Sequence, residues 1–210
     1  MKKITAVLII LLLLFTITGC SGSKTEATEN TDSKNTEQQG NDNVSADLFD
    51  NTDSQILVAY FSCTGNTKNV AQVIAEQTDA AIYEIEAEEP YSEEDLDYNT
   101  DCRANRENED ETARPGIKNP VENLENYHTI YLGYPIWWGK APKIIYTFLE
   151  NNELAGKTII PFCTSGGSGI DESVDALETL TEGVSWKQGK RFSSSADETE
   201  IADWITEVGA

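Results

Sequence analysis

Apolar and polar residues follow one another along the chain in a pattern that predicts strands and helices in turn. A continuous apolar run at 56–61, bounded by turn residues, is typical of a strand buried on both faces of a parallel sheet. Similar runs at 129–134 and 157–163 predict two more central strands, and the half-polar segments 81–87 and 184–192 suit edge strands. We therefore expect five strands.

Helical periodicity fills the gaps between these strands. Apolar residues recur at helical spacing near 68–77, 142–149, 174–180 and 201–208. Strands that alternate with helices predict an α/β fold with a doubly wound parallel sheet and helices on both of its faces.

Local residues indicate where these elements begin and where the pattern fails. Pro142 stands near the first position of a helix, and Ser195 and Glu198 have capping-box spacing ahead of the last one. Pro161 is unusual inside a central strand, because proline removes a ladder donor. The acidic segment 88–126 has no clean period, and we expect one helix and an irregular loop there.

The first twenty residues have the pattern of a signal peptide. Lys2 and Lys3 precede an apolar stretch at 4–17 that is short for a membrane-spanning helix. The sequence Ile-Thr-Gly-Cys that ends at Cys20 resembles the bacterial lipobox, which implies lipidation of Cys20. We therefore expect an extracytoplasmic protein that is lipid-anchored to the bacterial cell membrane.

The rest of the chain divides in two. Residues 21–53 are polar and acidic and bury too little apolar area to offset ordering entropy, so a flexible linker is predicted. Residues 54–210 have a suitable length for one folded domain.

Charge and residue counts exclude several functions. The formal net charge of −22 argues against nucleic acid as a partner, because a basic face is the usual footprint of such binding. His128 is the only histidine, which excludes multi-histidine metal sites, and the cysteines have no zinc spacing. We expect no metal. Cys63 lies at the N-terminus of a predicted helix, where the pKa of its thiol could be lowered. We favour the interpretation that Cys63 is a small buried residue that fits the turn.

The loop at 62–67, which joins the first strand to the first helix, has the composition of a phosphate site. It offers hydroxyls, a glycine and an asparagine at a helix N-terminus, where unpaired N–H groups favour anions. It has neither the lysine of a P-loop nor the three glycines of a dinucleotide turn. The sequence from Cys63 also resembles the nucleophile loop of low-molecular-weight phosphatases, but Asn69 stands where that family has an arginine.

Two further loops of unusual composition follow the third and fourth predicted strands. The segment 135–139 contains Trp137 and Trp138, large rings that could stack on a flat ligand, and the segment 164–169 is rich in glycine and hydroxyls. Carboxyl ends of parallel strands share one edge of a sheet, where ligands of doubly wound folds bind.

Together these three loops resemble those of the flavodoxin superfamily, over about residues 55–208. The resemblance implies the strand order 2-1-3-4-5 and non-covalent binding of FMN, for electron transfer or as a flavin-dependent reductase with an unknown redox partner or small-molecule substrate. No side chain is expected to act as a catalytic acid or base. Two alternatives stay open: a non-redox lipoprotein that binds a phosphorylated ligand, and a hydrolase that acts through Cys63. The residues implied to bind the cofactor are Ser62, Thr64, Gly65, Asn66, Thr67, Pro135, Trp137, Trp138, Gly139, Thr164, Ser165, Gly166, Gly167 and Gly169.

In the acidic segment 88–126, three arginines stand among carboxylates. Arg103, Arg106 and Arg114 could form a lid over an anionic ligand, but local salt bridges are favoured, to Glu107, Glu109 and Glu111.

Overall fold

A computed structural model describes residues 54–209 of the chain. The predicted signal peptide, the lipidation site Cys20 and the linker 21–53 lie outside the described residues. Within the described part, no helix is both long and apolar enough to cross a membrane.

The strands form one parallel sheet. Its order is β2-β1-β3-β4-β5, and β6 also pairs with β4. This arrangement confirms the predicted fold class, a flavodoxin-like doubly wound α/β sheet. The strands are β1 Ile56–Tyr60, β2 Ala81–Glu84, β3 Thr129–Pro135, β4 Thr158–Thr164, β5 Ser185–Trp186 and β6 Lys190–Phe192.

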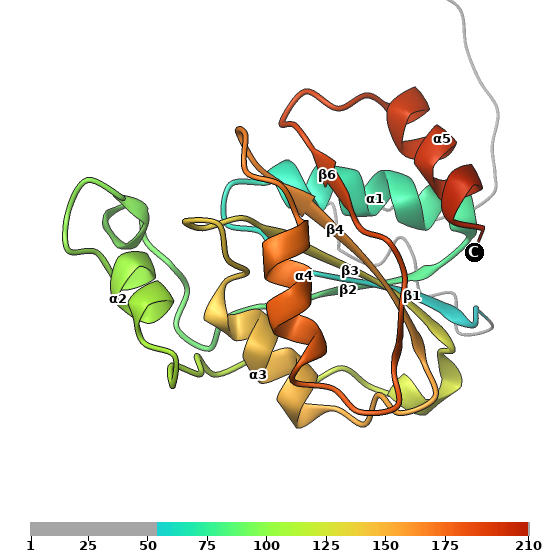
Figure 1. Cartoon of the computed structure of the whole chain (residues 1–210), viewed down its shortest axis with the longest axis horizontal. Helices are drawn as coiled ribbons and strands as arrows, with labels where there is room; N and C mark the ends of the chain where they lie inside the picture. Colours follow the sequence, from blue (N-terminus) through green and yellow to red (C-terminus); the bar gives the residue numbers. More distant parts are fainter. Residues whose placement is uncertain (1–53, 210) are drawn as a thin grey trace, which may run out of the picture. The chain divides into compact units, whose positions relative to one another are not determined.

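Helices cover both faces of the sheet, with α1 and α5 on one side and α3 and α4 on the other (Figure 1). This layering explains why the central strands are apolar at most positions. Leu57 and Ala59 pack with α3 and α4, while Val58 and Tyr60 pack with α1 and α5. The helices are α1 Asn66–Thr78, α2 Arg103–Glu109, α3 Lys143–Asn151, α4 Asp171–Glu178 and α5 Glu198–Val208.

The edge strand predicted at 184–192 is instead two short strands, and Pro161 explains the break. The carbonyl of Ile159 accepts a hydrogen bond from Lys187 N–H, so Ile159 turns its backbone toward the edge. Alternate residues of a strand turn the same way, so the missing N–H of Pro161 also faces the edge. Gly189 passes beside Pro161 at that point, and a Cβ on Gly189 would lie 3.0 Å from Pro161 Cγ.

The structure corrects one predicted helix start and confirms another. The last helix is capped by Asp197, whose side chain accepts from Glu200 N–H, so the Ser195–Glu198 capping box is wrong. Asp197 is the stronger N-cap because its negative charge is also stabilised by the positive N-terminal end of the helix dipole. Pro142 directly precedes Lys143, the first residue of α3, which agrees with its predicted place near the helix start.

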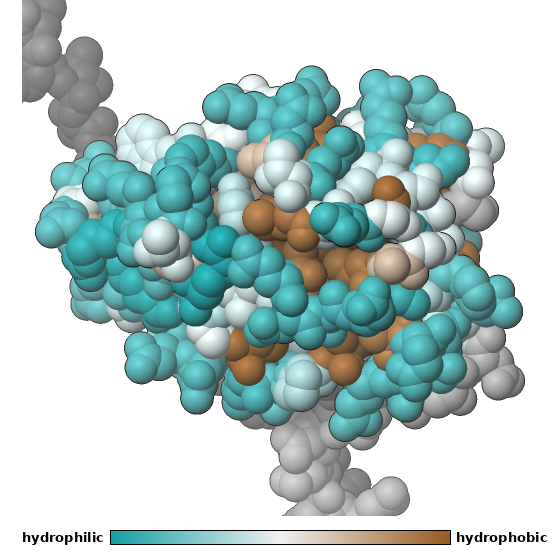
Figure 2. Space-filling model, turned by 60° about the horizontal axis from the view of Figure 1, so that its bottom comes forward, coloured by the Kyte–Doolittle hydropathy of each residue, from teal (hydrophilic) through white to brown (hydrophobic). Residues whose placement is uncertain are grey.

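The segment 88–126, which we call the insert, contains α2 and two short 3₁₀ turns, η1 Glu94–Leu96 and η2 Leu124–Asn126. One α-helix with irregular chain around it agrees with the prediction. Figure 1 shows α2 beyond the carboxyl ends of the strands. The surface drawn in Figure 2 is largely hydrophilic, with apolar patches set among polar side chains.

Candidate functional site

Loop 1, residues 62–67, turns sharply from β1 into α1. Gly65 has a φ of 86°, which favours glycine, and its carbonyl accepts the first helical hydrogen bond, from Asn69 N–H at 2.9 Å. No side chain caps this helix, in contrast to α2 and α5. The N–H groups of its first turn therefore have no partner within the helix and face the loop.

The hydroxyls of loop 1 surround this helix start. Ser62 Oγ accepts from Gly65 N–H at 3.2 Å, and Thr64 Oγ1 accepts from the Asn66 side chain at 3.2 Å. Lys68 lies in the first turn, but its ammonium is paired with Glu84 at 2.9 Å. Loop 1 thus presents neutral hydrogen-bond donors, and the charge of the nearby Lys68 is neutralised by Glu84.

Thr164 is the residue at which all three loops meet. Its Oγ1 lies 2.8 Å from Thr67 Oγ1 of loop 1, and both side chains are buried. Its carbonyl accepts from Ile136 N–H of loop 2, residues 135–139, at 3.0 Å. Thr164 itself begins loop 3, residues 164–169. The prediction that these segments share one edge of the sheet is confirmed.

Loop 2 ends in a tight turn that separates the two tryptophans. Trp137 and Lys140 exchange both backbone hydrogen bonds, and the two residues between them have positive φ, 50° for Trp138 and 81° for Gly139. Trp137 is buried, with its ring 5.7 Å from that of Phe61. Trp138 stands 64% exposed. One indole belongs to the core, and the other is exposed to solvent.

Loop 3 has glycines that the fold does not require. Gly166, Gly167 and Gly169 have no positive φ, and a Cβ built on any of them meets nothing within 4 Å. Neither backbone strain nor packing explains them. Their effect is to leave backbone uncovered at the edge of the sheet. Arg191 of β6 fixes this loop, donating to Ser165 Oγ and O at 3.2 Å each.

The structure adds contacts that sequence reasoning missed, all from the insert. Asn105 of α2 accepts a hydrogen bond from Trp138 Nε1 at 2.8 Å, and the ring of Tyr98 lies edge-on to Trp138 at 6.2 Å. Tyr91 packs edge-on to Trp137 at 5.4 Å. No short motif marks these residues, because their partners lie some 33 to 46 positions further along the chain.

The arginines of the insert form ion pairs. Arg103 binds Glu107 as predicted, but Arg106 pairs with Asp101 and Arg114 with Glu150 of α3. The partners predicted for Arg106 and Arg114 were therefore wrong. Arg106 pairs with a nearby aspartate that precedes α2, whereas Glu150 is brought to Arg114 by the fold.

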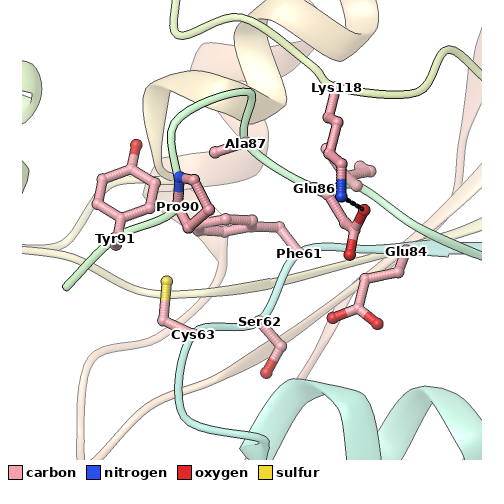
Figure 3. Close-up of a pocket in the computed structure, with 10 residues that line it drawn as sticks. Phe61, Ser62, Cys63, Glu84, Glu86, Ala87, Pro90, Tyr91 and Lys118 are labelled. Atoms are coloured by element: carbon pink, nitrogen blue, oxygen red, sulfur yellow. Dashed lines mark hydrogen bonds and ion pairs between the residues drawn. The ribbon is translucent and has the colours of Figure 1, made fainter. Parts of the chain in front are cut away.

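Beside loop 1, a cavity of about 210 Å³ opens between β2 and the insert (Figure 3). Phe61 and Tyr91 line it with Cys63, and the Glu86–Lys118 ion pair stands at one side. Cys63 is exposed, so the prediction that it is buried is wrong. The surrounding protein desolvates the Cys63 thiol and raises its pKa to about 12, with Arg103 offsetting this only in part. The thiol is neutral near pH 7, unlike that of a cysteine nucleophile.

Comparison with known proteins places this geometry in a family. A family model described as flavodoxin matches residues 55–208. The chain belongs to the flavodoxin family. A search of the curated proteins found no match.

Among solved structures, two from Bacteroides are similar over most of the flavodoxin-like region. A protein of Bacteroides eggerthii DSM 20697 that has been inferred to be a flavoprotein is 40% identical, with a TM-score of 0.70, covering 74% of this chain and 98% of that one. One of Bacteroides uniformis ATCC 8492, inferred likewise, is 41% identical, with a TM-score of 0.69, covering 72% and 97%.

A more distant relative was solved with a cofactor. The flavoprotein of Lactobacillus acidophilus NCFM in complex with FMN is 25% identical, with a TM-score of 0.54, covering 71% of this chain and 97% of that one.

Proposed function

We propose that this flavodoxin-family protein binds FMN where its three loops meet and acts in electron transfer, as a carrier or as a flavin-dependent reductase. One observation carries the proposal: Thr164 bonds loop 1 through its side chain and loop 2 through its carbonyl. That arrangement brings an anion site, an aromatic wall and an open glycine-rich backbone together. The relative solved with FMN supports the choice of ligand.

The donors of loop 1 fit a phosphate monoester. The N–H groups of the first turn of α1 have no side-chain cap, and Ser62, Thr64 and Thr67 add three hydroxyls within the same loop. Because Lys68 is neutralised by Glu84, the anion would be held by dipoles and hydrogen bonds, without a free cation.

Loops 2 and 3 fit a flat ring. Trp138 offers an exposed indole, and Gly139 beside it allows the backbone to approach closely. Gly166 and Gly167 leave backbone uncovered for the polar edge of a ring. FMN when bound would supply the redox chemistry, and these residues would orient it and exclude water.

The sequence pattern of the first twenty residues supports attachment to the membrane. We propose that Cys20 is lipidated and that the protein lies on the extracytoplasmic side of a bacterial membrane, where it meets its redox partner or a small substrate. If so, the Cys20→Ala variant expressed in a bacterium should no longer be found in the membrane fraction. Membrane association that persists in this variant would contradict the anchor.

Titration of the purified full chain with FMN tests the cofactor. Binding should quench flavin fluorescence with one site per chain, and riboflavin, which lacks the phosphate, should bind more weakly. Thr64→Val removes one hydroxyl and keeps the side-chain shape. Losing one hydrogen bond to a charged group costs about 1.5–3 kcal/mol, so affinity should fall roughly 10- to 150-fold.

Thr206→Val is the matched control, because Thr206 is an exposed residue on α5 whose hydroxyl bonds Ala202 O within the same helix. A wild-type chain that does not bind FMN would favour the alternative of a non-redox lipoprotein that binds a phosphorylated ligand. Aryl phosphatase activity that is lost in Cys63→Ser would favour the hydrolase, although the raised pKa of Cys63 argues against it.

A further inference from the structure

Trp138 stands in a conformation that costs free energy and brings no burial in return. Its φ of 50° lies in the left-handed region, which is strained for a bulky side chain. Strained residues of this kind cluster at functional positions, and Trp138 is 64% exposed. Packing of the fold therefore does not account for this indole.

The indole is nevertheless held in place, from the insert. Asn105 Oδ1 accepts the Trp138 Nε1–H at 2.8 Å. The amide of the same side chain donates to Thr100 O at 2.7 Å and Tyr98 O at 3.3 Å. Asn105 thus binds the indole with one end and the Tyr98 turn with the other, and Tyr98 places its ring edge-on to Trp138.

The helix that carries Asn105, α2, is itself held in place by contacts of Arg103. Arg103, in the same short helix, bonds Glu107 at 2.6 Å and Glu89 O at 2.8 Å, and its guanidinium lies 4.2 Å from the centre of the Tyr91 ring. Further along the insert, Glu111 bonds Lys140, the residue directly after loop 2, at 2.7 Å. The insert is therefore fastened to both sides of the Trp138 turn.

We propose that Asn105 is a positioning residue of the cofactor site, which fixes the Trp138 indole as the outer wall for the flavin ring. The insert is then part of the FMN site and not a surface decoration. This inference rests on the proposed function, because it assigns the wall of that same site.

The test combines FMN affinity with a double-mutant cycle in the purified full chain. Asn105→Leu removes the acceptor and should weaken FMN binding about 3- to 10-fold, the value of one neutral hydrogen bond. Asn119→Leu is the control, because Asn119 is an exposed asparagine of the same insert and its amide bonds Glu86 instead of the Trp138 indole.

The cycle separates positioning from a general structural role. If Asn105 acts through Trp138, Asn105→Leu should change nothing further in a Trp138→Phe background. Without FMN, acrylamide should quench tryptophan fluorescence more strongly in Asn105→Leu than in wild type, and this difference should vanish with Trp138→Phe. Far-UV circular dichroism of each variant shows that the chain is folded.

The outcomes are distinguishable. Wild-type protein without affinity for FMN would overturn the proposed function, and this inference with it. FMN binding that Asn105→Leu leaves unchanged, or weakens equally in the Trp138→Phe background, would overturn the inference alone.

Discussion

Glu111 fastens the insert to the start of α3, and removing its charge should destabilise the fold. Its carboxylate bonds Lys140 and Lys143 at 2.7 Å each. The Lys143 side chain is 0% exposed, whereas that of Glu111 is 66% exposed. The Lys143 ammonium also lies 4.3 Å from the centre of the Tyr146 ring. Glu111→Gln keeps the shape and leaves a buried ammonium without its carboxylate.

The magnitude follows from this asymmetry. Removing one partner of a fully buried pair costs about 3–5 kcal/mol, and exposed pairs contribute about 0–1 kcal/mol. Water reaches Glu111 and screens part of its effect, so we expect the free energy of unfolding to fall by about 1–2 kcal/mol. For a chain of this size each kcal/mol lowers Tm by roughly 2–4 °C, which predicts a loss of about 2–8 °C.

Glu109→Gln is the matched control, since it removes the same charge from an exposed position of the insert. None of the ion pairs found within residues 54–209 involves Glu109. Urea and thermal denaturation of both variants provide the measurement. Equal stability of Glu111→Gln and Glu109→Gln would refute the reasoning.

The pH dependence gives a second check on the same pair. Hydrogen bonds from Lys140 and Lys143 lower the pKa of Glu111 from its ordinary 4.5 to about 2. A carboxylate whose pKa is lowered in the folded state stabilises the fold at any pH above its pKa in the unfolded chain. This stabilisation is lost as the pH falls toward the folded-state pKa. The stability difference between wild type and Glu111→Gln should therefore be constant from neutral pH to about 5 and shrink toward pH 2.

Two more predictions follow from single positions. Gly133→Ala would place a Cβ 2.2 Å from Phe162 Cζ in the core, so it should destabilise by about 1–3 kcal/mol in urea denaturation. Gly166→Ala meets nothing within 4 Å and should be neutral, and equal effects of the two variants would contradict the packing. Because the surrounding protein desolvates the thiol of the exposed residue Cys63 and raises its pKa to about 12, its alkylation by iodoacetamide should be slow at pH 8 and still accelerate above pH 10. A rate that levels off near pH 8.5, as for a free thiol, would contradict this environment.

The sequence predicted the architecture well, because buried parallel strands leave a strong pattern. Leu57 and Val58 face opposite helical layers, so both must be apolar, and that run is visible without a structure. The convergence of the three loops also follows from topology, since the carboxyl ends of β1, β3 and β4 share one edge.

What the sequence could not show were contacts between distant segments. The bond between Asn105 and Trp138 joins residues 33 positions apart in an irregular region, and no period marks it. The split of the outer strand depends on which way Pro161 turns its nitrogen, which the pairing alone decides. The three loops for which the sequence predicted FMN binding lie together in the structure, and their roles in binding stay predictions.

Amide chemical-shift mapping of the full chain during titration with FMN tests the central claim most directly. The account predicts that the largest shifts fall on all three loops at once, at residues such as Thr64, Trp138 and Gly167, with smaller shifts at Asn105 in the insert. Thr206, on α5, should not move. Shifts confined to one loop, or concentrated away from Thr164, would contradict a single site built from three turns of the chain.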